Sequence, residues 1–273
     1  MFCGFQIKDI GFDFCDEVAG GSGTCETLKL QERSLINSFS TKVKEAVAHL
    51  GEKDGVIDGD VLESAWYPQL KFDVFISHSH TNLDKAMALS AAIKALLGID
   101  AFVDSCVWKC RDQLIEKLRE LTGNDPAKPC ANPSDEGEII AHADMMLNNS
   151  LMRMIDSCEC LMFLDTPRSI CRDGLASKTF SAWLYSEIVI SKYIRISVPE
   201  RYRKGRRMLN ESYVPAMDSF ALKISHGIDL AHLKQLTHEI FVKWVKTAKS
   251  RSLSGRPALD PLYELVSLGS MAD

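Results

Sequence analysis

A strand-helix-strand pattern between residues 71 and 104 constrains the fold more than any other feature of the chain. The segment from Lys71 to Ser77 contains a continuous apolar run of strand length, as expected for a strand buried on both faces of a parallel sheet. A helix is expected to start at Thr81 or Asn82 and to end at Gly98, and Ile99 to Asp104 is predicted to form the next strand. This βαβ unit predicts an α/β fold with a doubly wound parallel sheet, whose ligands bind beyond the carboxyl ends of the strands.

Composition sets broad limits on the class of protein. With 273 residues, 46% of them apolar, the chain can bury a substantial core. The net charge of -5 argues against a general nucleic-acid binder. No run approaches the ~20 apolar residues of a membrane span, and the N-terminus lacks a signal-peptide pattern. We therefore expect neither nucleic acid nor membrane as a partner, and a cytoplasmic location.

The cysteines predict neither a disulfide framework nor a metal centre. Their count of nine is odd, and no two of them form a Cys-x-x-Cys pair. Cys158 and Cys160 fall in an apolar segment and are expected to be small core residues. Cys106 and Cys110 lack a nearby histidine that could complete a metal set. We expect no metal and no bound cofactor.

Further elements follow from apolar periodicity along the rest of the chain. A helix is expected between Leu28 and Leu50, outside the α/β unit. A long polar insert spans residues 106–141, with a short helix near Leu114 to Leu121. The later predictions are a helix over Ala143 to Asp156, a third strand over Glu159 to Leu164, a strand over Phe220 to Ile224 and a closing helix over Leu230 to Val245.

Three motifs occur in an order that resembles the Toll/interleukin-1 receptor (TIR) domain. They are Phe72 to His80 (FDVFISHSH), Ile99 to Ser105 (IDAFVDS) and Ser181 to Ile188 (SAWLYSEI). The first two resemble the opening strands of the family. The third resembles the Ser-x-Trp-x-x-x-Glu helix of TIR domains that cleave NAD. The residues of these motifs are similar to those of bacterial TIR proteins, most of which serve in antiphage defence.

The resemblance implies a flavodoxin-like, doubly wound parallel sheet of about five strands. It divides the chain into an N-terminal helical extension at residues 1–70, a TIR domain at residues 71–250 with the insert at 106–141, and a loosely held tail at residues 251–273. In this family the loop after the second strand shapes the substrate cleft and contacts neighbouring domains. The insert of this chain is longer than usual there.

The resemblance also implies the active-site residues and the chemistry. NAD+ would be a consumed substrate, because no Gly-x-Gly-x-x-Gly motif follows a strand. Cleavage of the bond between nicotinamide and ribose gives the ribose carbon oxocarbenium character, which a carboxylate stabilises. Nicotinamide leaves as a neutral ring, so one carboxylate suffices. Glu187 would be that catalytic carboxylate, and the substrate-binding residues would be Ser77, His78, Ser79, Asp104, Ser105, Trp108 and Trp183.

Two classes of function remain open at this point. The expected activity is that of an NAD+ glycohydrolase or an ADP-ribosyl cyclase, which either depletes NAD+ or makes a messenger derived from ADP-ribose. The alternative is a non-enzymatic adaptor that signals by assembly of TIR domains. Both imply a homo-oligomer formed through TIR-TIR contacts, and the enzyme implies a separate effector or trigger protein. Glu187 together with Trp183 favours the enzyme, since adaptors typically lack the glutamate.

Overall fold

Five parallel strands form the central sheet, in the spatial order β3-β2-β4-β1-β8. Their bounds are β1 Cys3–Lys8, β2 Val74–Ser77, β3 Ala101–Phe102, β4 Cys160–Asp165 and β8 Lys234–Leu236. A smaller antiparallel sheet contains β5 Cys171–Asp173, β6 Ala176–Thr179 and β7 His226–Gly227. This computed structural model describes residues 1–8, 57–103, 111–167, 169–173, 176–203 and 225–266.

Helices cover both faces of the central sheet. They are α3 Gly59–Trp66, α4 Leu83–Leu97, α6 Arg111–Leu121, α7 Pro133–Ser157, α8 Ala182–Tyr193, α9 His238–Ser250 and α10 Asp260–Leu265. On one face, side chains of α4, α9 and α10 pack with strand residues such as Phe5 and Ile76. On the other face, α3, α6, α7 and α8 pack with Phe75 and Phe163. The α/β class and the five-stranded parallel sheet predicted from the sequence are therefore confirmed, and they are compatible with a flavodoxin-like fold.

The strand order places a topological switch point between β2 and β4. From β2 the chain passes through α4 to β3 on one side, and then through α6 and α7 to β4 on the other side of β2. Open α/β sheets bind ligands in the crevice at the carboxyl ends of two such strands. In this protein that position lies after Ser77 of β2 and Asp165 of β4.

The N-terminal strand occupies a position that the sequence analysis did not give it. Residues 1–70 were expected outside the α/β domain, whereas β1 lies inside the sheet, paired with β4 and β8. In the flavodoxin-like order 2-1-3-4-5 the fourth place belongs to a strand that follows the third in the chain. Here β1 fills that place. The alternation of Cys3, Phe5 and Ile7, all buried on one face, accounts for its insertion.

The C-terminal segment also differs from the expectation of a loose tail from residue 251 onward. Ala258, Leu259, Leu262 and Tyr263 are almost fully buried. The indole Nε1 of Trp244 donates a 2.6 Å hydrogen bond to the carbonyl of Ala258, which fixes the segment on α9. These four side chains are therefore part of the core.

The closing helix starts later than predicted. Thr237 caps α9 by accepting a hydrogen bond from the amide of Ile240, and the preceding residues Lys234–Leu236 form β8. The strand predicted at Phe220 to Ile224 and the helix predicted between Leu28 and Leu50 lie outside the described residues.

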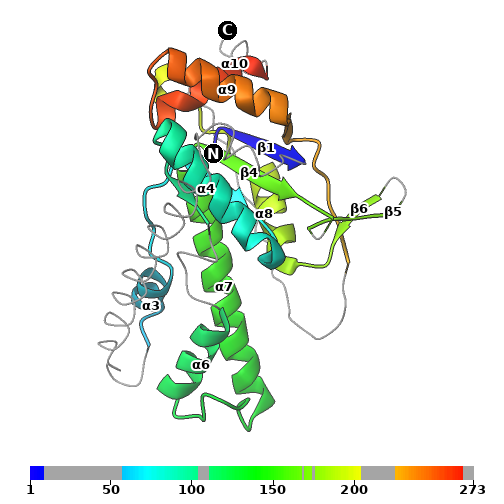
Figure 1. The fold of residues 1–273 in the computed structure, drawn as a ribbon. Helices are drawn as coiled ribbons and strands as arrows, with labels where there is room; N and C mark the ends of the chain where they lie inside the picture. The colour runs from blue at the N-terminus through cyan, green and yellow to red at the C-terminus, as the bar shows by residue number, and fades with distance from the viewer. Residues whose placement is uncertain (9–56, 104–110, 168, 174–175, 204–224, 267–273) are drawn as a thin grey trace.

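The polar insert contains a projecting helical hairpin of α6 and the first half of α7 (Figure 1). The helix predicted from Ala143 begins ten residues earlier, at Pro133, because Asn132 caps it and proline is favoured in the first helical turn. The guanidinium of Arg119 binds Glu136 across the hairpin, and Arg111 binds Asp144 in the same way. These pairs order a segment whose composition had indicated a loop.

Two cysteines lie where the sequence placed them. Cys158 and Cys160 are buried in the core, as predicted. Burial raises the pKa of the Cys158 thiol to about 12 and raises that of Cys160 as well. Both therefore stay protonated at neutral pH, which suits small apolar core residues.

Candidate active site

Helix α8 carries the Ser-x-Trp-x-x-x-Glu motif. It begins where Ser181 accepts a hydrogen bond from the amide of Leu184 at 3.2 Å. Glu187 lies on the buried side of this helix and is only 2% exposed. Trp183 lies one turn earlier, is half-buried and packs against the same apolar cluster. The helix thus places an aromatic ring and a carboxylate one turn apart, as the sequence predicts.

Ser77 meets Glu187 at the carboxyl end of β2. Its hydroxyl donates a 2.5 Å hydrogen bond to Oε2 of Glu187, and both side chains are buried. Ser77 and Glu187 are 110 positions apart in the chain, so only the fold brings the two motifs together. A carboxylate buried beside a hydroxyl at the switch point is well placed to contact a ligand.

Asn82 joins the two loops at the switch point. Its side-chain nitrogen donates to Ser79 Oγ at 2.6 Å, to Thr166 Oγ1 at 2.7 Å and to Ser169 Oγ at 3.1 Å. Ser169 in turn donates to the carbonyl of Leu164. The loop after β2 is therefore tied to the loop after β4, which fixes the edge of the sheet where the site lies.

The other sequence-predicted site residues divide into two groups. His78 is buried directly after β2, and Ser79 is half-buried and bonds to Thr81 and Asn82. The structure thus places Ser77, His78, Ser79, Trp183 and Glu187 around β2 and α8. Asp104, Ser105 and Trp108 lie outside the described residues.

A set of polar residues at the same edge was missed by the sequence analysis. Asp165 ends β4 with a side chain that is 0% exposed, and it contacts Gln6 and Arg172. A carboxylate at the end of a buried apolar strand is a usable sequence signal for this edge of the sheet. Gln6 gave no such signal, because its segment was not assigned to the sheet.

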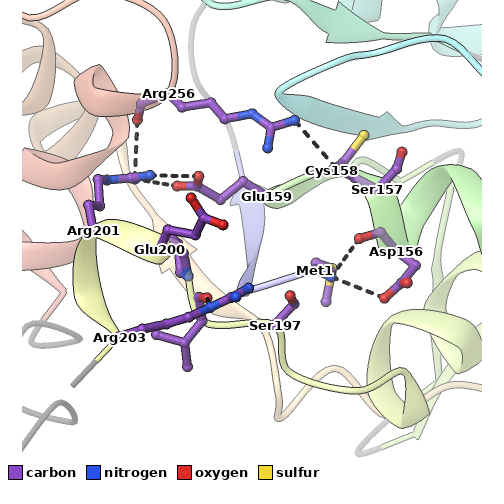
Figure 2. A pocket seen from close by; sticks show the side chains of 12 residues that line it. Met1, Asp156, Ser157, Cys158, Glu159, Ser197, Glu200, Arg201, Arg203 and Arg256 are labelled. Carbon is purple, nitrogen blue, oxygen red and sulfur yellow. Dashed lines mark hydrogen bonds and ion pairs between the residues drawn. The ribbon is translucent and has the colours of Figure 1, made fainter. Parts of the chain in front are cut away.

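A hollow near the sheet lies at the opposite end of the strands, by their amino ends. It has a volume of about 430 Å³ and is lined by Glu159, Ser197, Arg201 and Arg256, among others (Figure 2). Arg201 makes a two-pronged contact with Glu159, at 2.8 and 2.5 Å, and a third contact with Asp260. These paired charges fasten the C-terminal segment to the amino ends of the strands, which is a structural role.

Comparison with known proteins identifies no family for this chain. No protein-family model, no curated protein and no solved structure matches the chain. Within the described parts of the chain, no helix is both long and apolar enough to cross a membrane.

Proposed function

We propose that the protein is a TIR-type enzyme that cleaves the bond between nicotinamide and ribose in NAD+, with Glu187 as the catalytic carboxylate. One observation carries the proposal. The hydrogen bond between Ser77 and Glu187 joins the first-strand motif to the Ser-x-Trp-x-x-x-Glu motif, at the edge where α/β sheets bind ligands. The resemblance of three motifs to NAD-cleaving TIR domains supplies the substrate and the reaction.

The proposed chemistry needs a single carboxylate. The bond from the ribose carbon to the nicotinamide nitrogen breaks, and its electron pair leaves with the neutral nicotinamide. The carboxylate of Glu187 stabilises the oxocarbenium charge and accepts hydrogen bonds from the ribose hydroxyls. Water then attacks the carbon and loses a proton, or a nitrogen of the same substrate closes a cyclic product.

Two neighbours would prepare Glu187 for this role. Ser77 holds the carboxylate in one orientation in the absence of substrate, because its hydroxyl donates to Oε2. Trp183, one turn away on α8, offers an aromatic face to the nicotinamide or ribose end of the substrate. Burial of Glu187 keeps water away, which strengthens its electrostatic effect on a developing positive charge.

An adaptor that signals by assembly is the second candidate. The observation in its favour is the exposure of large apolar side chains at both ends of α8, namely Phe180, Tyr193 and Ile196, at 62%, 69% and 70%. A second copy of the chain could cover such residues. In the enzyme, the same assembly would raise turnover, and specific activity would then increase with protein concentration.

Incubation of the purified protein with NAD+ and identification of the products by mass tests the proposal. We expect free ADP-ribose or a cyclised form, together with nicotinamide. Glu187→Gln should remove turnover, and Ser77→Ala should lower it by about tenfold through loss of one positioning hydrogen bond. Glu239→Gln, at an exposed position of α9, is the matched control and should keep full activity. Concentration-dependent assembly without any NAD+ consumption would instead favour the adaptor.

A further inference from the structure

Polar side chains interrupt an otherwise apolar face of the central sheet. Along β1, Cys3, Phe5 and Ile7 pack toward α4 and α9, so Gln6 points to the opposite face, toward α8. The same alternation turns Asp165 of β4 and Gln235 of β8 toward α8. Phe163 and Leu161 of β4, which share the face of Asp165, belong to the apolar cluster there. The polar residues lie in neighbouring strands near their carboxyl ends.

These side chains form one connected chain of hydrogen bonds. Gln235 Nε2 donates to Gln6 Oε1, and Gln6 Nε2 donates to Asp165 Oδ2 at 2.5 Å. Arg172 of β5 also donates to Asp165 Oδ2. The carboxyl ends of β1 and β4 point toward β5 and β6, so Arg172 closes the cluster from the side of the hairpin (Figure 1). Both donors therefore converge on the same oxygen of Asp165.

The other oxygen of Asp165 has no hydrogen-bond partner among the described residues. Oδ1 is inaccessible, and the side chain as a whole is 0% exposed. A buried carboxylate oxygen without a donor is costly, by more than an average hydrogen bond contributes. In a folded protein such an atom commonly marks a position completed by a ligand.

We propose that Asp165 Oδ1 accepts hydrogen bonds from a ribose diol of the substrate, and that Arg172 contacts the phosphate attached to that ribose. A carboxylate oxygen lacking donors is matched by vicinal hydroxyls, which donate without carrying charge. The adjacent guanidinium is matched by phosphate, to which it can present two parallel N–H groups. The cluster thus fits a ribose phosphate unit. This rests on the proposed function, because the same substrate would present its other ribose to Glu187.

Access to Asp165 runs through the exposed members of the cluster. The side chain of Arg172 is 44% exposed, and Gln235 is also exposed. In the proposed complex the Arg172 side chain turns from Asp165 toward the phosphate, and Gln6 continues to hold Oδ2. Gln6, only 4% exposed, is therefore a positioning residue that fixes the carboxylate.

Binding of ribose phosphates tests this inference without relying on turnover. The protein is titrated with ADP-ribose, AMP and 2′-deoxy-AMP by calorimetry, in the wild type and in Asp165→Asn. We expect the wild type to bind the ribose compounds at least about tenfold more tightly than the deoxy compound. Asp165→Asn should abolish this preference for ribose over deoxyribose. Arg172→Gln should weaken the binding of all three ligands, because each of them carries phosphate, and should keep the preference.

Thermal unfolding separates a ligand site from a structural contact. If the cluster binds ligand, Asp165→Asn should melt at or above the temperature of the wild type without ligand, and should lose the upward shift that AMP gives the wild type. If Asp165 served only to hold Arg172, Asp165→Asn would lower the melting temperature and leave the AMP-induced shift unchanged. Gln6→Leu provides a second test, because it removes the hydrogen bond from Gln6 to Asp165 and keeps the carboxylate itself.

Ligand binding and NAD+ consumption test the ribose phosphate site and the proposed activity separately. Ribose binding that depends on Asp165, in a protein that does not consume NAD+, would support the subsite and refute the enzyme. NAD+ consumption with unchanged KM and unchanged ligand affinity in Asp165→Asn would support the enzyme and overturn the subsite. A wild type that binds none of the ribose phosphates also overturns it.

Discussion

Buried charged side chains at the amino ends of the central strands (the amino edge) differ in their hydrogen-bond partners from those at the carboxyl ends (the carboxyl edge). At the amino edge, Arg201 donates to both carboxylate oxygens of Glu159 (Figure 2). Tyr263 donates a further hydrogen bond to Glu159 at 3.0 Å. At the carboxyl edge, Asp165 is paired with Arg172 through Oδ2, and its Oδ1 has no hydrogen-bond donor among the described residues. Both oxygens of Glu159 therefore have donors, whereas Asp165 has described donors on one oxygen alone.

This difference in partners distinguishes buried charges that stabilise the fold from buried charges that are available to a ligand. Buried charges that serve stability are paired, since an uncompensated charge costs several kcal/mol. Buried charges that serve binding must retain capacity for a ligand, and the rest of the protein offsets that cost. The hollow near Glu159 is therefore a less convincing ligand site than the carboxyl edge. Substitutions at the amino edge should mainly lower stability, and substitutions at the carboxyl edge should mainly lower ligand binding or turnover.

The largest effect on stability is expected at the amino edge. Arg201→Met should lower the free energy of unfolding by about 3 kcal/mol, because it leaves Glu159 buried with only Tyr263 as a described donor. Urea denaturation followed by circular dichroism measures this. Arg251→Met is the control, since its pair with Glu264 is exposed and should contribute less than about 1 kcal/mol. Equal effects of the two substitutions would remove the distinction between a compensated edge and ordinary surface pairs.

A smaller loss of stability, coupled to loss of function, is expected at the switch point. Asn82→Ala removes the side chain that ties Ser79 to Thr166 and Ser169, and should cost about 1–2 kcal/mol. Because the two loops border the proposed site, NAD+ turnover per folded molecule should fall as well. Thr81→Ala, which removes only an exposed contact with Ser79, should change neither quantity. Full turnover in Asn82→Ala would show that the two loops need not be tied together.

The smallest effect concerns acid pH and the helical hairpin of α6 and α7. The hydrogen bond from Arg119 lowers the pKa of Glu136 from 4.5 to about 2. The folded-state pKa is depressed, so the stabilisation is fully present above about pH 4.5 and is lost as the pH falls toward 2. The contribution is below about 1 kcal/mol, because solvent screens the pair.

Amide exchange in residues 111–141 as a function of pH measures this effect. Protection should decrease between pH 4.5 and 2 in the wild type. In Glu136→Gln it should already be reduced at pH 6 and should show no corresponding step. A step of equal size in both proteins would assign the acid sensitivity to another carboxylate.

The sequence was sufficient for the parts of the fold that are local. The βαβ unit from β2 to β3 follows from an apolar run, a capped helix and Gly98, which ends α4 with a positive φ of 66°. The start of α8 follows from Ser181, and the placement of Trp183 and Glu187 one turn apart follows from helical geometry. None of these predictions requires knowledge of distant contacts.

The parts that were missed depend on long-range pairing. Strand β1 is short and is separated by more than 150 residues from β4, the strand it pairs with, so no local pattern could assign its place. The cluster of Asp165 and Gln6 depends on that pairing and was invisible for the same reason. Likewise, residues 251–273 were expected to form a loosely held tail, yet Ala258, Leu259, Leu262 and Tyr263 are buried. Long-range hydrogen bonds with Trp244 and Glu159 hold this segment in place.

The most direct test compares Glu187→Gln with Arg201→Met in two assays, NAD+ turnover per folded molecule and the free energy of unfolding. We expect Glu187→Gln to lose at least about a hundredfold in turnover and to change stability by less than about 1 kcal/mol, since glutamine can still accept the Ser77 hydrogen bond. Arg201→Met should lose stability and keep its turnover. A Glu187→Gln protein that consumes NAD+ at the wild-type rate would contradict the assignment of the carboxyl edge as the active site.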